Sequence, residues 1–188
     1  ISLNLNWKKV VQGDDTKVIT IADPILREEI LENHDVDSDK KITENDMINI
    51  SVLDIAEKGI TSLKGLEYAK NLTELYAYGN KIKDISPIVA IGQSGWYDLT
   101  NNEITDITCI ANSKSDKALN IGLMNNYIDF TGNVKNIEVL KADYAKSRDS
   151  DSTVSAVNYM ISSQRYGKPV DADREVTLDT KIKQKLIE

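Results

Sequence analysis

An acidic segment near the N-terminus has the residue types and the spacing of a calcium-binding loop. Oxygen-bearing side chains occupy the first, third, fifth, ninth and twelfth positions of a twelve-residue run, namely Asp35, Asp37, Asp39, Thr43 and Asp46. The seventh position, Lys41, needs to supply only its backbone carbonyl, and Ile42 fills the apolar eighth position. Calcium takes about six to eight hard oxygen ligands, and this spacing brings such oxygens to one point. The segment therefore predicts a structural Ca²⁺ site.

Two positions of this loop depart from the usual calcium-loop pattern. The sixth position, where glycine is usual, is Lys40, and a left-handed backbone costs more free energy there than at glycine. The last position is Asp46 instead of glutamate, so its carboxylate reaches an ion only if the loop is tighter. Dockerin-type loops, which this one resembles, also end in aspartate. The alternative is a solvated acidic turn that keeps the shape of a metal loop without metal.

A repeated hydrophobic pattern indicates the elements that position this loop. Four segments align, and they start 22, 22 and 24 residues apart, at Leu53, Leu75, Tyr97 and Ile121. Apolar residues two positions apart lie on one face of a short strand. The fifth residue after each start is Lys58, Asn80, Asn102 and Asn126. An asparagine side chain can bond the backbone of its own coil and of its neighbour, so this column predicts an asparagine ladder.

These columns predict an α/β leucine-rich-repeat solenoid of about four coils of 22–24 residues. One coil buries only one of its sides, so stability comes from stacking neighbouring coils, and both ends need caps. Lys58 stands where the first coil would carry asparagine. Such a departure is expected of a terminal coil, which has a neighbour on one side only.

The repeat region resembles the opening repeats of internalin-like surface proteins of Gram-positive bacteria. The resemblance is carried by the stretches Gly59–Leu75, Gly79–Ile88 and Asn101–Ile107, and it covers about residues 18 to 165. It implies strands on the concave side and tight 3₁₀ turns on the convex side. It also implies a secreted or cell-surface location, adhesion, and a protein or glycan ligand on the concave face.

The segment before the repeats has the features of an N-terminal cap. Residues 18 to 21 alternate like a strand edge, and Asp23-Pro24 then begins a helix with proline at its first position. This opening resembles the internalin-type cap, a shortened EF-hand-like unit. We therefore divide this half of the chain into an extension at 1–17, an EF-hand-like cap at 18–50 and repeats at 51–131.

The segment after the repeats predicts a C-terminal cap at 132–165 made of a helix and a strand. Apolar spacing over residues 135 to 147 favours a helix, and the β-branched stretch at 154–161 favours a strand. A second helix over 152–163 is the alternative. Residues 166–188 then form a linker and the possible start of a second cap-like unit, because residues 176–188 echo the strand and helix of the first cap.

The composition excludes several classes of function. Thirty acidic residues against 23 basic ones give a net charge of −7, which argues against binding nucleic acid or docking electrostatically on an anionic membrane. No apolar run reaches the length of about 18 residues that a membrane-spanning helix needs. One histidine, His34, and one cysteine, Cys109, offer neither a zinc site nor an activated nucleophile. We therefore expect no enzymatic activity.

A surface of the repeats is the better candidate for ligand binding. The repeat columns place a mainly aromatic patch on the concave face, with Asp54 and Glu74 also around it. Its candidate ligand-binding residues are Tyr76, Tyr78, Trp96, Asp98 and Met124. Tyrosine and tryptophan are enriched at interface hot spots. The alternatives are that these aromatic side chains cover each other or lie under the cap. Trp96 could also belong to the core, because its coil has Ser94 where an apolar residue is expected.

The sequence thus predicts a non-enzymatic binding module of a secreted or cell-surface bacterial protein. Its ligand, a protein or a glycan, would bind on the concave repeat face. The alternative is a structural spacer or an accessory domain of a larger, tandemly built surface protein. The pattern gives no prediction of the oligomeric state.

Overall fold

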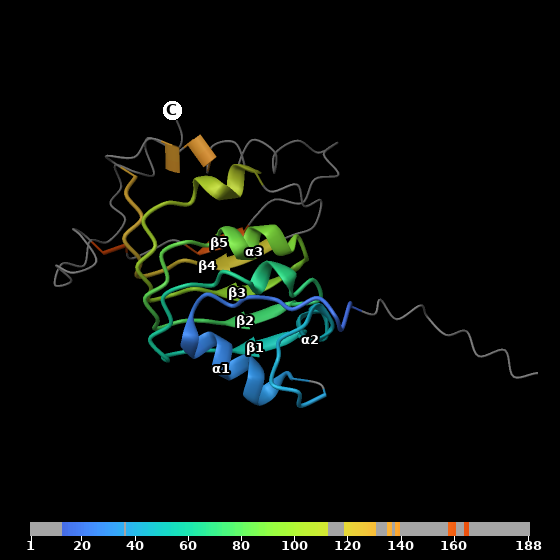
Figure 1. The fold of residues 1–188 in the computed structure, drawn as a ribbon. Coiled ribbons are helices and arrows are strands. Elements are labelled where there is room, and N and C mark those ends of the chain that lie inside the picture. The colour runs from blue at the N-terminus through green and yellow to red at the C-terminus, as the bar shows by residue number, and fades with distance from the viewer. Residues whose placement is uncertain are drawn as a thin grey trace, which may run out of the picture.

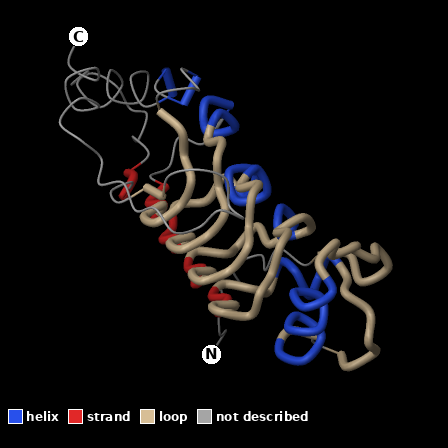
Figure 2. The backbone as a smooth tube through the Cα atoms, turned by 90° about the vertical axis from the view of Figure 1, so that its left-hand side faces the viewer, coloured by secondary structure: helices blue, strands red, loops and turns tan. Residues whose placement is uncertain are grey.

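A computed structural model describes residues 13–35, 37–112, 119–130, 135–136, 138–139, 158–160 and 164–165. The chain winds as a solenoid whose short strands line one side, with helical turns on the opposite side (Figures 1 and 2). The strands are β1 (Val52–Asp54), β2 (Glu74–Tyr76), β3 (Gly95–Asp98), β4 (Leu119–Gly122) and β5 (Asn158–Met160), and they form one parallel sheet in that order.

The strand register confirms the repeat read from the sequence. Leu53 pairs with Leu75, Leu75 with Tyr97, and Tyr97 with Ile121, which are the four predicted starts. All four side chains are buried, and so are the apolar residues two positions later in each coil. The leucine-rich-repeat solenoid is therefore confirmed as the fold.

The helical side of the solenoid differs in part from the prediction of 3₁₀ turns. Two coils do carry 3₁₀ turns there, η1 (Leu66–Tyr68) and η2 (Thr108–Asn112), but the second coil carries an α-helix, α3 (Ser86–Ile91). Proline in the first turn of α3 has a backbone angle suited to a helix start, and Gly92 ends the helix in the left-handed region at φ 70°.

The predicted asparagine ladder is present in the structure. Asn80, Asn102 and Asn126 are all buried; the side-chain oxygen of each accepts from a backbone N–H of the preceding coil. Their amide groups donate to carbonyls of their own and the preceding coil. Neighbouring rungs share acceptors. The carbonyl oxygen of Ala77 accepts hydrogen bonds from the side-chain amides of Asn80 and Asn102, and that of Leu99 accepts from Asn102 and Asn126.

Strand β5 continues the sheet of the repeats. It pairs in parallel with β4, with Ile121 opposite Tyr159, so the alternative of a helix over 152–163 is wrong at 158–160. Residues 135, 136, 138 and 139 are helical, as predicted. The rest of that helix, residues 154–157 and 161 of the predicted strand, and the linker and second cap-like unit at 166–188 lie outside the described residues.

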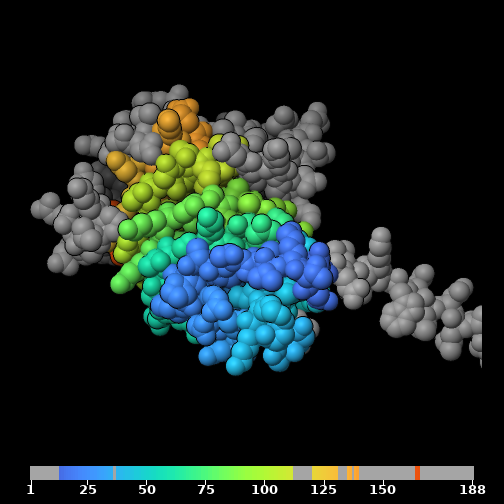
Figure 3. Space-filling view, viewed as in Figure 1, coloured from blue at the N-terminus to red at the C-terminus, as the bar shows by residue number. Residues whose placement is uncertain are grey.

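The segment before the repeats packs onto the first coil as a helix, a loop and a second helix. These are α1 (Pro24–Asn33), the acidic loop, and α2 (Glu44–Ile48). Apolar side chains of this segment, among them Leu26, Ile30 and Met47, belong to the same buried core as the repeats. Figure 3 shows this N-terminal segment, in blue, lying directly against the first coils. In the described part of the chain, no helix has the length and apolar character needed to cross a bilayer.

Candidate functional site

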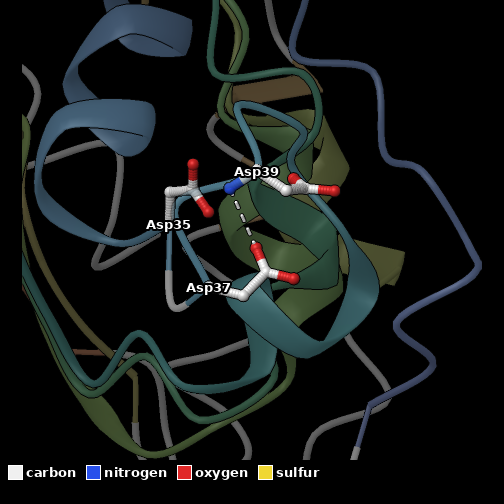
Figure 4. Close-up of side chains that lie close together, drawn as sticks. All are labelled: Asp35, Asp37 and Asp39. Carbon is white, nitrogen blue, oxygen red and sulfur yellow. Dashed lines mark hydrogen bonds between the residues drawn. The ribbon is translucent and has the colours of Figure 1, made fainter.

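The acidic loop brings three of its predicted ligands together. Oxygens of Asp35, Asp37 and Asp39 all lie within 4.8 Å of one another (Figure 4). The backbone folds them inward, because the N–H of Lys40 donates to Asp35 Oδ2 at 2.9 Å and the N–H of Asp39 donates to Asp37 Oδ1 at 3.2 Å. Lys40 adopts φ 63°, the left-handed conformation that the sixth position of a calcium loop requires.

A buried oxygen in this loop has no hydrogen-bond partner. Asp35 Oδ1 is shielded from solvent and receives no hydrogen bond. An unpaired buried oxygen is costly, and coordination by a cation would satisfy it. The donor set of this loop therefore fits a hard cation such as Ca²⁺.

The pKa values of Asp37 and Asp39 are shifted in opposite directions by their neighbours. The N–H of Asp39 lowers the pKa of Asp37, but desolvation and the adjacent Asp39 and Asp35 carboxylates outweigh it and raise this pKa overall. Asp39 is partly neutralised by Lys41, whose Nζ lies 2.7 Å from Asp39 Oδ2, and this hydrogen bond lowers the pKa of Asp39. Repulsion between these carboxylates is what a bound divalent cation would relieve.

The two remaining predicted side-chain ligands are engaged in capping a helix. Thr43 is the N-cap of α2, and its backbone N–H and hydroxyl both donate to Asp46 Oδ2, at 2.7 and 2.6 Å. Asp46 is buried and lies outside the group of three converging carboxylates. Thr43 and Asp46 thus form a capping box that starts α2.

A buried aspartate joins the N-terminal segment to the first coil. Asp23 caps α1 by accepting from the N–H groups of Ile25 and Leu26, and its Oδ2 accepts from the N–H and the hydroxyl of Thr61, both at 2.8 Å. Burial alone would raise the pKa of Asp23, but these hydrogen bonds outweigh it, so the pKa lies below its ordinary value. The ionised carboxylate is therefore the form that stabilises this junction.

Asp23→Ala is expected to lower the free energy of unfolding at pH 7 by about 2 kcal/mol, since a helix cap and two links to Thr61 are lost. Because the folded-state pKa is depressed, the Asp23 contribution is present above the ordinary value of 3.8 and disappears as the pH falls below it. Urea unfolding of the parent and the variant at pH 7 and pH 3 measures this difference. Asp15→Ala, at an exposed position, is the control, and an equal difference at both pH values would contradict the role of the carboxylate.

The sheet presents a second candidate site, its outward side. The strand register, and the backbone hydrogen bonds between coils just after the strands, align twelve outward residues in three rows. We call these three rows the strand face. The rows are Val52–Glu74–Trp96–Asn120, Asp54–Tyr76–Asp98–Gly122 and Ala56–Tyr78–Thr100–Met124. The strand face thus holds all five predicted ligand-binding residues. Tyr78 and Trp96 are exposed, whereas Tyr76, Asp98 and Met124 are half-buried.

The structure rejects the alternative that Trp96 belongs to the core. Its side chain is 37% exposed, and the neighbouring Tyr97 fills the interior instead. The Tyr97 hydroxyl donates to Leu72 O at 2.9 Å, and burial raises the pKa of Tyr97 to about 12. Gly95 permits this placement, because a Cβ there would lie 2.8 Å from the Tyr97 hydroxyl and 2.5 Å from Thr73 O.

His34 and Cys109 have the environments of structural residues. The N–H of His34 donates to Ile30 O at the end of α1, and partial burial lowers the pKa of its imidazole. Cys109 packs against the core within η2, and burial raises the pKa of its thiol to about 11. A thiol with so high a pKa is a poor nucleophile at neutral pH.

No protein-family model and no curated protein matches the chain. The solved structure of an internalin (inlF) from Listeria monocytogenes is similar, with a TM-score of 0.53 and 20% sequence identity over 78% of this chain. An internalin C2 (inlC2) from the same species is also 20% identical over 78% of the chain, with a TM-score of 0.46. The chain spans 45% of the length of the first and 67% of the second.

The chain has an internalin-like leucine-rich-repeat fold. At this level of identity the likeness to the first internalin establishes the fold alone. The partners of the internalin-like repeat and the role of its acidic loop therefore have to be argued from its own residues.

Two residues that sequence reasoning missed complete the internalin-like repeat. Gln164 Oε1 accepts from the N–H of Ile128, and its amide donates to Leu123 O, so Gln164 adds a rung to the asparagine ladder. Arg165 lies over the ring of Tyr127, 5.2 Å from its centroid. Gln164 is the fifth residue after Tyr159, which is the ladder position because Tyr159 pairs with the repeat start Ile121. The asparagine pattern did not identify this rung because glutamine replaces asparagine there.

Proposed function

We propose that the chain is a non-enzymatic binding module of a secreted or cell-surface bacterial protein, and that its ligand binds on the strand face. The observation that carries the proposal is an open aromatic group on a rigid sheet. Tyr78 and Trp96 are 38% and 37% exposed, and Tyr76 lies between their rows. Exposed aromatic side chains cost little conformational entropy on binding and give large contact areas. The internalin-like fold supports the same function by analogy.

The rigidity of the sheet supports this assignment. The backbone beneath the strand face is held by parallel pairing and by the buried asparagine ladder. The Tyr76 hydroxyl donates to Glu74 Oε2 at 3.0 Å, which orients both side chains before any ligand arrives. A pre-organised surface loses less entropy on binding than a mobile one.

The proposal is tested by selecting ligands and then removing the aromatic side chains. The parent is used to select from a random twelve-residue peptide library and from a glycan array. Tyr76→Ala with Tyr78→Ala is expected to weaken binding of the selected ligands by more than about tenfold, since hot-spot truncations cost about 2 kcal/mol or more. Val18→Ala with Ile25→Ala, which removes exposed apolar groups away from the strand face, is the matched control. Ligands that bind the tyrosine variant as well as the parent would favour the alternative of a spacer or accessory domain.

We further propose that the acidic loop binds a structural Ca²⁺ through Asp35, Asp37 and Asp39. Support comes from the convergence of the three carboxylates and from the unpaired Asp35 Oδ1. Lys41 would contribute its backbone carbonyl, whereas Thr43 and Asp46, the other two predicted ligands, cap α2 at the end of the loop. The ion would neutralise the repelling carboxylates and fix α1 relative to α2.

A further inference from the structure

The strand face carries an acidic stripe that runs across the strands. Asp54 and Asp98 flank Tyr76 in the middle row, and Glu74 lies beside Tyr76 on the same strand. Neighbouring strands are about 4.8 Å apart, so Asp54 and Asp98 are separated by about 10 Å along the sheet. The twelve residues of the strand face include three carboxylates and no lysine or arginine. This surface is therefore negatively charged across β1, β2 and β3.

In the described part of the chain, the three carboxylates of this stripe, those of Asp54, Glu74 and Asp98, take part in no ion pair. Oδ1 of each aspartate accepts only a neutral backbone N–H two residues onward, at 3.1 and 3.0 Å. The nearby Lys58 is paired with Glu29 at 2.6 Å. A partner covering the stripe would bury uncompensated carboxylates unless it brought cations with it.

The aromatic side chains of the strand face suit the same partner. Tyr76, Tyr78 and Trp96 stand beside the carboxylates, and a lysine or arginine side chain between them would gain both an ion pair and a cation–π contact. The hydrogen bond to Glu74 and the charges of Glu74 and Asp54 raise the pKa of Tyr76, in keeping with a negative local field.

We propose that the partner of the strand face is a protein segment bearing lysine or arginine side chains, which bind across the Asp54–Tyr76–Asp98 row. This inference rests on the proposed function and narrows its ligand class. Hydroxyl groups of a neutral glycan could bond these oxygens but would leave three negative charges without compensation. Opposite charges also accelerate encounter and select among partners.

The test uses an end-capped hexalysine peptide, with hexaglutamate and neutral cellotetraose as comparison probes. Trp7→Phe leaves Trp96 as the single tryptophan, so its fluorescence reports binding at the strand face. The triple variant Asp54→Asn, Glu74→Gln and Asp98→Asn removes three charges while keeping side-chain shape and a side-chain oxygen that can accept the same hydrogen bonds. Asp15→Asn, Glu32→Gln and Glu138→Gln, all exposed and outside the strand face, give the matched change in net charge. Circular dichroism melting verifies that both triple variants fold.

Hexalysine is expected to change Trp96 fluorescence, and the strand-face triple should weaken its binding by about tenfold, consistent with three modest, partly exposed ion pairs. The matched triple should stay within about twofold of the parent. Equal weakening in both triples, or no hexalysine signal, would overturn the basic partner. Cellotetraose binding that needs Tyr76 and Tyr78 but not the three acids would also overturn it, while leaving the proposed binding function intact. If no ligand of any class lost affinity when strand-face residues were replaced, the proposed binding function itself would be contradicted.

Discussion

Asn102→Ala is expected to lower the free energy of unfolding by about 3 kcal/mol. Its side chain is fully buried, and Asn102 Oδ1 accepts from the N–H of Ile82 at 3.0 Å, a group that the alanine variant leaves without this partner. An unsatisfied buried donor costs about 1–3 kcal/mol, and the lost side-chain volume adds to it. The carbonyl oxygens of Ala77 and Leu99 each keep a second amide donor, from Asn80 and Asn126 respectively. The expected loss of unfolding free energy is therefore smaller than if every hydrogen bond of Asn102 left an unpaired group.

Urea denaturation of the parent and the variant measures this loss. Asn33→Ala is the control, because Asn33 is exposed and bonds only to Glu29 within α1. The shared acceptor gives a sharper expectation for the double variant Asn80→Ala with Asn102→Ala. Ala77 O then loses both amide donors, so the double variant should cost more than the sum of the single variants. A change of under about 1 kcal/mol in Asn102→Ala would show that the ladder contributes little.

Calcium is expected to stabilise the parent by about 2.7 kcal/mol when its concentration is about a hundred times the dissociation constant. For a site with a dissociation constant near 10 µM, within the range of about 10⁻⁷ to 10⁻³ M for such loops, this corresponds to about 1 mM Ca²⁺. Asp35→Ala should abolish the increment, because it removes the unpaired buried oxygen and one of three converging carboxylates. Unfolding in 1 mM Ca²⁺ and in chelator, together with calorimetric titration, measures both quantities.

The control for the calcium experiment is Asp15→Asn, which removes an exposed negative charge outside the loop. It should retain the full calcium increment, since the site depends on converging oxygens and not on net charge. The absence of binding heat in the parent would rule out the calcium site. The loop would then be the acidic turn that the sequence left open as the alternative.

The repeat was predictable because its physical signal is periodic. Burial on one side of every coil repeats the same apolar columns, and the strand register matches the four starts found from the sequence. The ladder followed for the same reason, since an amide that bonds two coils must recur once per coil. Loop spacing also predicted that Asp35, Asp37 and Asp39 would converge.

Features outside the period could not be predicted in this way. The α-helix at 86–91 depends on a local proline. Trp96 is exposed because Tyr97 takes the interior position, where its hydroxyl donates to Leu72 O and where Gly95 leaves room for its ring. Strand β5 was predicted from its β-branched stretch, but Tyr159 follows Ile121 by 38 residues, so the 22–24-residue spacing did not indicate its pairing with β4. The capping role of Thr43 and Asp46 competes with metal ligation for the same atoms, and spacing alone does not decide between them.

The rungs of the ladder also bear on how the length of this protein can change. Each rung forms hydrogen bonds only with its own coil and the preceding one. The contacts of a coil therefore do not depend on how many coils lie beyond its neighbour. Duplication of a gene segment encoding 22 residues, such as 75–96, would supply one strand, one rung and one set of core contacts together. Selection could in this way widen the strand face by about 4.8 Å at a time without redesigning the rest of the molecule.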